Sequence, residues 1–298
     1  MSASLVRVPP EQWPALAELI RNCNRRPDGG VHCLHAACGA DIASHAAELS
    51  ALLAGEAAFW AVTERGERVG IVGCTFDPAL QRAWVRGPLA IQPRLLEDLL
   101  PVVGPTLESA LPEIRQFNAF PAADGALLND WYAAAGYAPQ QLNRVLRATI
   151  AEVPHEPRTV RAATLPDLPS VLGLHQELFP SAYLGAADFQ RATEDGDCVL
   201  FVASGDGGVP MGYLYAQDSA ADQETYVDYL GVSPTHRGQG LGRALLDAAA
   251  RWGARRGRRH LALTVREDRR SALNLYRRAG FAEVSAGRHW QKVASAVT

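Results

Sequence analysis

Lysine is almost absent from this chain, since Lys292 is the only one among 29 lysine and arginine residues. Because 32 acidic residues balance the arginines to a net charge of −3, the composition gives no case for binding nucleic acid or an acidic membrane. Long apolar runs are also missing, so the sequence predicts neither a signal peptide nor a membrane-spanning segment. We therefore expect a cytoplasmic protein.

Cysteines are few and odd in number, five in all, which argues against a disulfide framework in a chain without a secretion signal. Three of them, Cys23, Cys33 and Cys38, lie close to His32 and His35 in the sequence. Their spacing matches no paired zinc-ligand pattern. We therefore expect reduced thiols and no metal site in this segment, with zinc as the alternative.

The most informative stretch covers residues 224–246. Residues 226–232 are rich in β-branched and aromatic side chains and predict a strand, whereas apolar residues recur at helical spacing from Leu241 onward. Between them lies Arg-Gly-Gln-Gly-Leu-Gly at 237–242. Glycines let a ligand approach the backbone, and the N–H groups of a helix's first turn point toward it. The stretch therefore predicts an anion site, best suited to a phosphate or pyrophosphate.

Two familiar phosphate loops do not fit this run. A P-loop requires Lys-Ser or Lys-Thr after its last glycine, but Arg243 and Ala244 follow Gly242. A Rossmann fingerprint requires glycine or alanine at position 243, and no strand ending in a ribose-binding acid follows at the usual distance. The loop therefore belongs to another class of phosphate site.

The loop and a second motif downstream resemble one known family. Val-Ser-Pro at 232–234 and the glycine run at 237–242 match, without a gap, the pattern Val-x-Pro and Arg/Gln-x-x-Gly-x-Gly/Ala. Leu-Tyr-Arg-Arg-Ala-Gly-Phe at 275–281 has the form Leu-Tyr-x-x-x-Gly-Phe. Together they resemble the acyl-CoA loop and the closing helix of the GNAT superfamily of N-acyltransferases.

This resemblance implies a binding mode for acetyl-CoA as co-substrate. Its pyrophosphate would lie on the loop amides, and its pantetheine arm would pair with the strand at Leu230 and Val232, where two strands splay apart. A backbone N–H near Leu230 would donate to the oxyanion. Arg269 stands where many family members have asparagine, so this chain departs from the family at one expected cofactor contact. Asn274 is a weaker candidate for a cofactor contact, because two residues' spacing on a helix turns it away from Tyr276. The residues expected to bind the cofactor are Leu230, Gly231, Val232, Arg237, Gly238, Gln239, Gly240, Leu241, Gly242, Arg243 and Asn274.

Acyl transfer to an amine requires a proton acceptor for the amine and a proton donor for the leaving thiolate. Tyr276 matches the family tyrosine that faces the CoA sulfur, and its alternative is a core aromatic. Asp228 is the first choice as base, because it alternates on the same strand face as Tyr226 and Leu230. Glu224 is the second choice. For Asp228 the alternative is a structural carboxylate bonded to the backbone or to an arginine.

The order of predicted elements occurs twice. The first half predicts a strand at 5–7, helices at 11–20 and 42–53, and paired strands at 58–63 and 68–74. The second half predicts a strand at 159–161, helices at 165–178 and 186–193, and hairpin strands at 199–203 and 211–216. Trp-Tyr-Ala-Ala-Ala-Gly-Tyr at 131–137 also shares its Tyr-to-Gly spacing with the motif at 275–281.

Two copies of one α/β fold explain this repeat, and the arrangement resembles two-domain GNAT proteins of the mycothiol synthase type. Each copy is expected to be a mixed, mostly antiparallel sheet flanked by helices. We predict a degenerate domain at 1–150, a linker at 151–158 and a catalytic domain at 159–298. In the first copy the strand at 82–85 leads almost directly into a helix at 95–100 without a glycine loop, so Tyr132 is expected to be a packed residue.

The sequence therefore predicts an acetyl-CoA-dependent N-acetyltransferase acting on a primary amine of a small molecule. A protein N-acetyltransferase and a non-catalytic acyl-CoA-binding or sensory module are the alternatives. We expect the acceptor pocket to form from the segment 179–185, which contains Tyr183, and from the region near Asp228.

Overall fold

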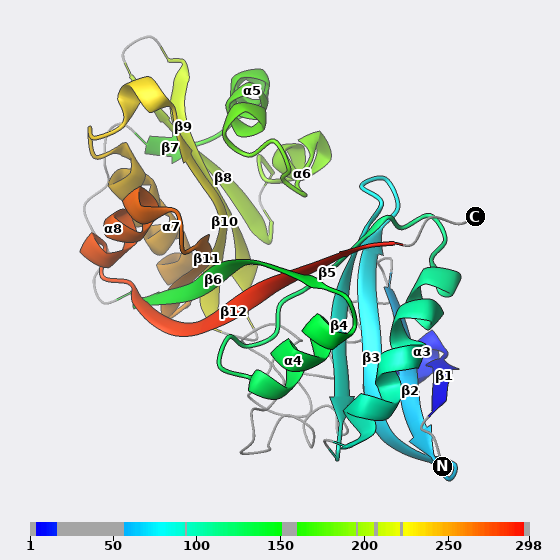
Figure 1. Cartoon of the computed structure of the whole chain (residues 1–298). Coiled ribbons are helices and arrows are strands. Elements are labelled where there is room, and N and C mark those ends of the chain that lie inside the picture. Colours follow the sequence, from blue (N-terminus) through cyan, green and yellow to red (C-terminus); the bar gives the residue numbers. More distant parts are fainter. Residues whose placement is uncertain are drawn as a thin grey trace. The chain divides into compact units, whose positions relative to one another are not determined.

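The structure is a computed structural model of the 298-residue chain (Figure 1). It describes residues 4–16, 57–92, 94–150, 160–194, 196–205, 208–220 and 223–294. The cysteine and histidine cluster at 23–38, the helix predicted at 42–53 and the linker predicted at 151–158 lie outside these described residues. Cys74 and Cys198 are both free and buried.

The chain forms two compact units. Unit 1 comprises Met1–Asn143 together with Ser285–Thr298, and unit 2 comprises Arg144–Val284. Strands β6 (Ala138–Thr149) and β12 (Ala282–Val293) contain the points at which the chain passes between units. The end of the chain thus contributes to the first unit, which the sequence did not indicate. The boundaries expected at 150 and 159 stay a prediction, because the segment between them is not described.

Unit 1 contains a mixed sheet with helices. Besides β6 and β12, its elements are β1 (Ser4–Val8), η1 (Pro10–Leu16), β2 (Ala57–Glu64), β3 (Glu67–Asp77), β4 (Arg82–Ala90), α3 (Arg94–Ala110), β5 (Gln116–Ala119) and α4 (Ala126–Ala134). The strand order is β1-β2-β3-β4-β5-β12. β4 and β5 run parallel and the other neighbours antiparallel. Leu95, Leu99, Val103 and Leu107 recur every four residues along α3, so one face of this helix is buried in the core.

Unit 2 has the same architecture. Its elements are β7 (Val160–Ala162), η3 (Leu165–Asp167), α5 (Leu168–Leu178), α6 (Ala186–Arg191), β8 (Cys198–Ser204), β9 (Pro210–Ser219), β10 (Glu224–Val232), η4 (Pro234–His236), α7 (Leu241–Arg255), β11 (His260–Arg266) and α8 (Arg270–Arg278). The strand order is β11-β10-β9-β8-β7, with β10 and β11 parallel. One core cluster joins the sheet to α7 and α8, and another joins its opposite face to α5 and α6 (Figure 1). We call these the α7 face and the α5 face.

The element order of unit 1 recurs in unit 2, as the sequence repeat predicted. In each unit a short strand precedes an antiparallel hairpin, a third strand, a helix, a parallel partner strand and a second helix. The mixed, mostly antiparallel sheet flanked by helices is confirmed. One difference concerns β4, which continues to Ala90 instead of ending at Val85, because Leu89 and Ala90 still pair with β3.

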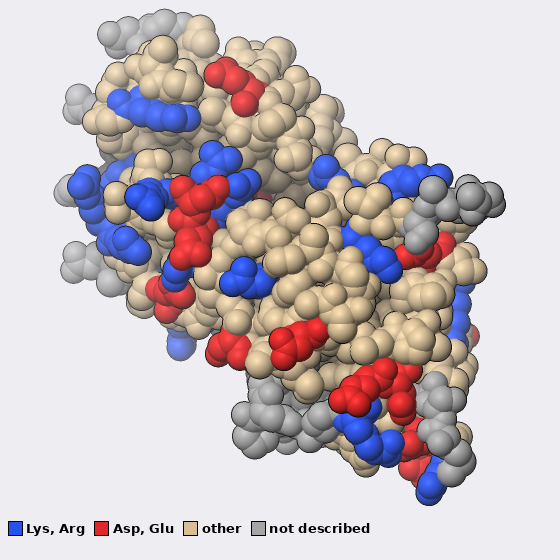
Figure 2. Space-filling view, viewed as in Figure 1, with Lys and Arg blue, Asp and Glu red and all other residues tan. Residues whose placement is uncertain are grey.

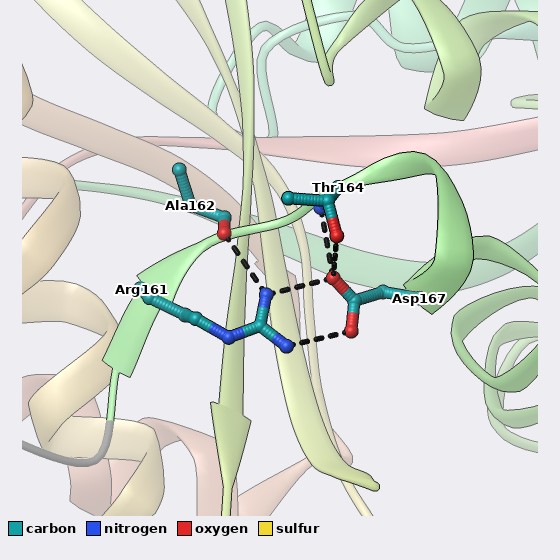
Figure 3. Close-up of polar contacts among 4 residues, drawn as sticks. All are labelled: Arg161, Ala162, Thr164 and Asp167. Carbon is teal, nitrogen blue, oxygen red and sulfur yellow. Dashed lines mark hydrogen bonds and ion pairs between the residues drawn. The ribbon is translucent and has the colours of Figure 1, made fainter. Parts of the chain in front are cut away.

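The start of α5 is fixed by a buried carboxylate (Figure 3). Asp167 accepts hydrogen bonds at 2.7 Å from both terminal nitrogens of Arg161, which lies on β7. The backbone N–H and the hydroxyl of Thr164 donate to Oδ2 of the same carboxylate at 2.8 and 2.9 Å. The Arg161 guanidinium holds the pKa of Asp167 well below its usual range. This network anchors α5, and with it the segment 179–185, to the edge of the sheet.

We predict that Asp167→Asn weakens this anchor by about 1–2 kcal/mol at neutral pH, because it removes the charge that Arg161 binds. Since folding lowers the pKa of Asp167, its contribution to stability is present above the ordinary aspartate pKa of about 3.9 and is lost as the pH falls below it. Amide hydrogen exchange of α5, measured at neutral and acidic pH, tests both statements.

Asp268→Asn is the matched control, because Asp268 pairs with Arg266 while half-exposed, and exposed pairs contribute little. Equal exchange rates of α5 in the parent and in Asp167→Asn at neutral pH would contradict the anchoring role.

Candidate active site

Strand β10 loses one of its two neighbours partway along its length. Its parallel pairing with β11 ends at Val227, opposite Leu263, whereas its antiparallel pairing with β9 continues to Val232. From Asp228 onward, the β11 side of β10 has no strand partner in the described part of the chain. The two strands therefore splay, and those backbone groups of residues 228–231 that point away from β9 have no strand partner in that part of the chain and are open to a ligand.

A β-bulge lies at the same point. The register with β9 shifts between Val227 and Tyr229, which makes Asp228 the extra residue. The Tyr183 hydroxyl donates to Asp228 Oδ1 at 2.5 Å, and Gln217 Nε2 donates to Oδ2 at 3.0 Å. Burial raises the pKa of Asp228 above its usual value, and these two hydrogen bonds oppose the rise. A carboxylate with a raised pKa is a suitable proton acceptor near neutral pH.

The bulge also decides which side chains share a face. Val227 packs on the α7 face and Tyr229 on the α5 face, as expected when an extra residue lies between them. Leu230 packs on the α7 face, whereas the contacts of Asp228 come from the α5 face. The prediction that Asp228 and Leu230 share a face is therefore wrong, because the bulge shifts the alternation by one residue.

The glycine run forms the turn between β10 and α7. Gly238 and Gly240 have φ values of +79° and +81°, and a β-carbon on either would meet nothing within 4 Å. Gln239 is exposed between them, and α7 begins at Leu241. Within the described residues, the backbone N–H groups of residues 238–243 have no intramolecular acceptor. A row of free amides at a helix N-terminus fits the predicted anion site.

Gly242 serves a different purpose from the two glycines before it. A β-carbon there would lie 2.9 Å from Leu275 Cδ2 and 3.7 Å from Leu230 Cδ2. Gly242 therefore lets α8 pack closely against the first turn of α7 and the open part of β10. Gly231 is also confined, because a β-carbon would lie 2.7 Å from the Tyr213 ring.

Two arginines of the predicted cofactor site use their side chains within the protein. Arg237 Nε donates to the Val232 carbonyl at 3.2 Å, which places this guanidinium at the end of β10. Arg243 donates to Asp247 at 2.9 Å and to the Arg278 carbonyl at 3.2 Å, so it links α7 to the end of α8. The backbone N–H of Arg243 has no acceptor among the described residues and remains available to a ligand.

Tyr276 lies on α8 in the core cluster of the α7 face, together with Val265 and Leu230 from the two splayed strands. Its ring packs against Phe281 with centroids 5.7 Å apart. Burial alone raises the pKa of Tyr276 to about 12, so the phenol is protonated at neutral pH and can donate a proton. Asn274 is exposed on a different side of α8, as its spacing from Tyr276 predicts.

Glu224 lies at the opposite end of β10 from the splay. It is four residues before Asp228, or about 13 Å along a strand. Its carboxylate is buried and forms an ion pair with Arg147 Nη2 at 2.9 Å. The structure thus gives Glu224 a structural partner and does not bring it to Asp228.

Unit 1 contains the counterpart of Tyr276 but not of the loop. Tyr132 on α4 is fully buried, and its hydroxyl donates to the Gly87 carbonyl of β4. Its ring contacts Trp131 and Tyr137 edge to face. The prediction that Tyr132 is a packed residue is confirmed.

Sequence reasoning did not find Gln217. This residue lies on β9 opposite Tyr226, and only the bulge brings its amide to Asp228. The turn at residues 205–208 could have been used to predict which residues of β8 and β9 pair. The contact between Gln217 and Asp228 depends instead on the bulge in β10, and no local sequence pattern marks that bulge.

Charged side chains of both signs lie close together on the face shown in Figure 2. In unit 2, for example, Arg144 pairs with Glu267 at 2.6 Å and with Glu283 at 2.5 Å. Among the described residues, no helix is long and apolar enough to cross a membrane. The same residues contain no group of three or more potential metal ligands.

Part of the chain, including this site, is similar to known proteins. Residues 168–281 match the model of the acetyltransferase (GNAT) family. The chain is 40% identical to streptothricin acetyltransferase of Streptomyces lavendulae over 89 residues, which are 30% of this chain and 47% of that protein. It is 41% identical to mycothiol acetyltransferase of Geodermatophilus obscurus over 69 residues, 23% of this chain and 22% of that protein. The chain thus spans less than half the length of these relatives.

Two solved structures share the fold over nearly the whole chain. A GCN5-related N-acetyltransferase from Sphaerobacter thermophilus superimposes with a TM-score of 0.75 at 21% identity, covering 98% of this chain and 96% of that one. A tandem GNAT protein from the clavulanic acid biosynthesis pathway gives 0.72 at 16% identity, covering 99% and 100%. These likenesses concern the fold alone. The sequence match to the GNAT family model, at residues 168–281, contains the splay, the glycine loop and Tyr276.

Proposed function

We propose that unit 2 transfers an acetyl group from acetyl-CoA to a primary amine of a small molecule, by direct attack of the amine. The opening between β10 and β11 carries this proposal. It begins at the bulge, where Asp228 contacts groups of the α5 face, and it borders the cluster of the α7 face that contains Tyr276. A donor and an acceptor could thus meet from opposite faces of the sheet.

The residues of the loop fit the phosphates of acetyl-CoA. The free N–H groups of residues 238–243 can donate to a pyrophosphate, and the open space above Gly238 and Gly240 leaves room for it. The unpaired edge of β10 at Leu230, Gly231 and Val232 can bind an amide-containing arm as an added strand would. Acetyl-CoA, when bound, supplies the activated acetyl thioester.

Asp228 is the residue proposed to receive the amine proton. An alkyl ammonium has a pKa near 10, so the acceptor arrives charged and must lose a proton before it attacks. The carboxylate attracts the ammonium group and then accepts its proton, and the raised pKa of Asp228 brings the two proton affinities closer together. A backbone N–H near Leu230 would stabilise the negative charge that develops on the carbonyl oxygen.

Tyr276 is the residue proposed to protonate the departing thiolate. Its hydroxyl keeps its proton at neutral pH, because burial raises the pKa of Tyr276 to about 12. A thiol has a pKa of about 8.5, which lies below the pKa of Tyr276, so the phenol stabilises the departing sulfur by donating a hydrogen bond and gives up its proton only in part. This hydrogen bond strengthens as negative charge grows on sulfur.

A small acceptor is supported by the relatives and by the local structure. The two curated relatives described above are named for streptothricin and mycothiol. The segment 179–185 lies against Asp228 through Tyr183 and would form one wall of the acceptor site. The second candidate, a module that binds acetyl-CoA without turnover, has no observation that favours it, and the experiments below separate the two.

We predict that calorimetric titration with acetyl-CoA gives one site per chain and that Gly240→Leu lowers the affinity at least about tenfold, or about 1.4 kcal/mol. The side chain would occupy the space reserved for the pyrophosphate, and the left-handed backbone would be strained as well.

Gly257→Leu controls for the strain, because Gly257 follows the other end of α7 with φ +74° and equally open surroundings. Similar affinities for the parent and Gly240→Leu would mean that this loop does not hold the pyrophosphate.

We predict that Tyr276→Phe lowers kcat for amine-dependent release of CoA thiol by about a hundredfold or more, because it removes the proton donor. The ring and its packing remain, so the affinity for acetyl-CoA should change little. Thiol release can be followed with a chromogenic thiol reagent across a panel of small amines.

Tyr132→Phe removes the same atom from the counterpart in unit 1 and should leave the rate of thiol release unchanged. An unaltered kcat in Tyr276→Phe would refute the proton-donor role. Binding of acetyl-CoA without thiol release from any amine would instead favour the non-catalytic module.

A further inference from the structure

Tyr183 reaches the site from outside the sheet and contacts the proposed base directly. It lies in the segment between α5 and α6, and its hydroxyl donates to Asp228 Oδ1 at 2.5 Å. Gln217 donates to the other oxygen, Oδ2, at 3.0 Å from β9. Two donors from different elements thus hold both oxygens, which fixes the plane of the carboxylate on a residue that the bulge frees from regular pairing.

The segment that contains Tyr183 is itself held in place. The Tyr183 backbone N–H donates to the Tyr229 hydroxyl at 3.3 Å, and the two rings lie 5.6 Å apart. Tyr229 in turn packs edge to face against His175, in the last turn of α5, and against Phe179, which directly follows this helix. The Gly185 N–H donates to Asp188 at the start of α6. The position of the Tyr183 hydroxyl is therefore determined by packing.

The Asp228 carboxylate and the Tyr183 ring can both still contact a ligand. A carboxylate offers about four lone-pair sites, and Tyr183 and Gln217 use two of them, so an ammonium group can still bind Asp228. Tyr183 remains 49% exposed as a whole residue although its hydroxyl is engaged. An exposed aromatic ring beside a carboxylate is favourable for a cation, since the ring face attracts positive charge.

We propose that Tyr183 is a positioning residue that, together with Gln217, orients the Asp228 carboxylate, and that its exposed ring borders the cationic amine of the acceptor. This inference rests on the proposed function, because it assigns the amine to Asp228. It makes the segment between α5 and α6 the part of the chain that recognises an aliphatic ammonium group. The residue acts on the reaction through Asp228 and through the amine, and it exchanges no proton with either.

The charged and titratable groups around Asp228 come from three elements. Asp188 of α6 repels negative charge on the carboxylate, and Tyr226 and Tyr229 of β10 are neutral at physiological pH because burial raises the pKa of each to about 12. His175 of α5 lies behind Tyr229, and burial lowers its pKa, which keeps it neutral. Removing the Tyr183 hydroxyl would therefore take away a donor that favours the charged carboxylate, and none of the described neighbours named here is a cation that could replace it.

We predict that Tyr183→Phe moves the acidic limb of the pH profile of kcat/KM upward by about one pH unit, since it removes one of the two donors that stabilise the charged form of Asp228. Loss of a donor to the carboxylate raises the pKa of Asp228, so the active form appears at higher pH. Gln217→Leu should act in the same direction, because it removes the second donor.

Tyr226→Phe is the matched control, because its hydroxyl donates to Thr264 at 2.8 Å and does not touch the carboxylate. Its profile should keep the parental limb. Tyr183→Leu removes the ring as well, and should raise KM for the amine about two- to fivefold beyond Tyr183→Phe if the ring borders a cation. An acidic limb at the same pH in the parent and in Tyr183→Phe would overturn the role of the hydroxyl in orienting Asp228. An equal KM for the amine in Tyr183→Phe and Tyr183→Leu would overturn the role of the ring beside the cation.

A readout independent of turnover separates this inference from the proposed function. The carboxyl carbon of Asp228, assigned by comparison with Asp228→Asn, can be titrated by NMR in the parent and in Tyr183→Phe. A higher pKa in the variant supports the positioning role even if no amine is acetylated, in which case the proposed function alone fails. An unchanged pKa of Asp228 refutes the positioning role whatever the activity.

Discussion

The site depends on the point at which β10 stops pairing with β11. An extra residue at Asp228 interrupts the ladder and increases the local twist, so the parallel partner cannot follow beyond Val227. Pairing with β9 continues on the other side and keeps β10 in place. Unpaired backbone groups inside a sheet need another partner, and a ligand that binds as an added strand provides it. The same bulge turns Asp228 and Leu230 toward opposite faces, which gives the opening two chemically different sides.

The three glycines of the loop meet two structural requirements within five residues: open space above the backbone amides and close packing of α8. Gly238 and Gly240 keep the surface above the amides open, whereas Gly242 removes a side chain that would strike Leu275. The first requirement concerns a ligand and the second concerns the packing of α8. Because α8 also carries Tyr276, the residue that admits this helix helps to set the distance between the anion site and the phenol. In the proposed mechanism, cofactor binding and proton transfer would thus be linked by the packing of a single turn.

Local patterns predicted much of this arrangement, and contacts between distant segments account for the rest. The glycine run and the motif at 275–281 are short and continuous, so they were sufficient to predict the turn before α7 and the position of Tyr276 on a helix. The order of elements, together with the similar motif at 131–137, was sufficient to predict that the fold is repeated. The face of Leu230 was predicted wrongly, because a bulge depends on register with β9. Gln217 and the pairing of Glu224 with Arg147 were not found for the same reason, since each brings together residues from different strands.

The first unit clarifies which features belong to the fold and which to the chemistry. There, too, the third strand continues past its parallel partner, since pairing of β4 with β5 ends at Val85 while β4 extends to Ala90. Splaying is therefore common to both copies. What differs is that α3 begins at Arg94 without a glycine loop, and that the hydroxyl of Tyr132 is already bonded to the protein. An open strand edge alone does not make an anion site or a proton donor. The free amides before α7 and the phenol of Tyr276 are the features of the second unit on which the proposed acyl transfer rests.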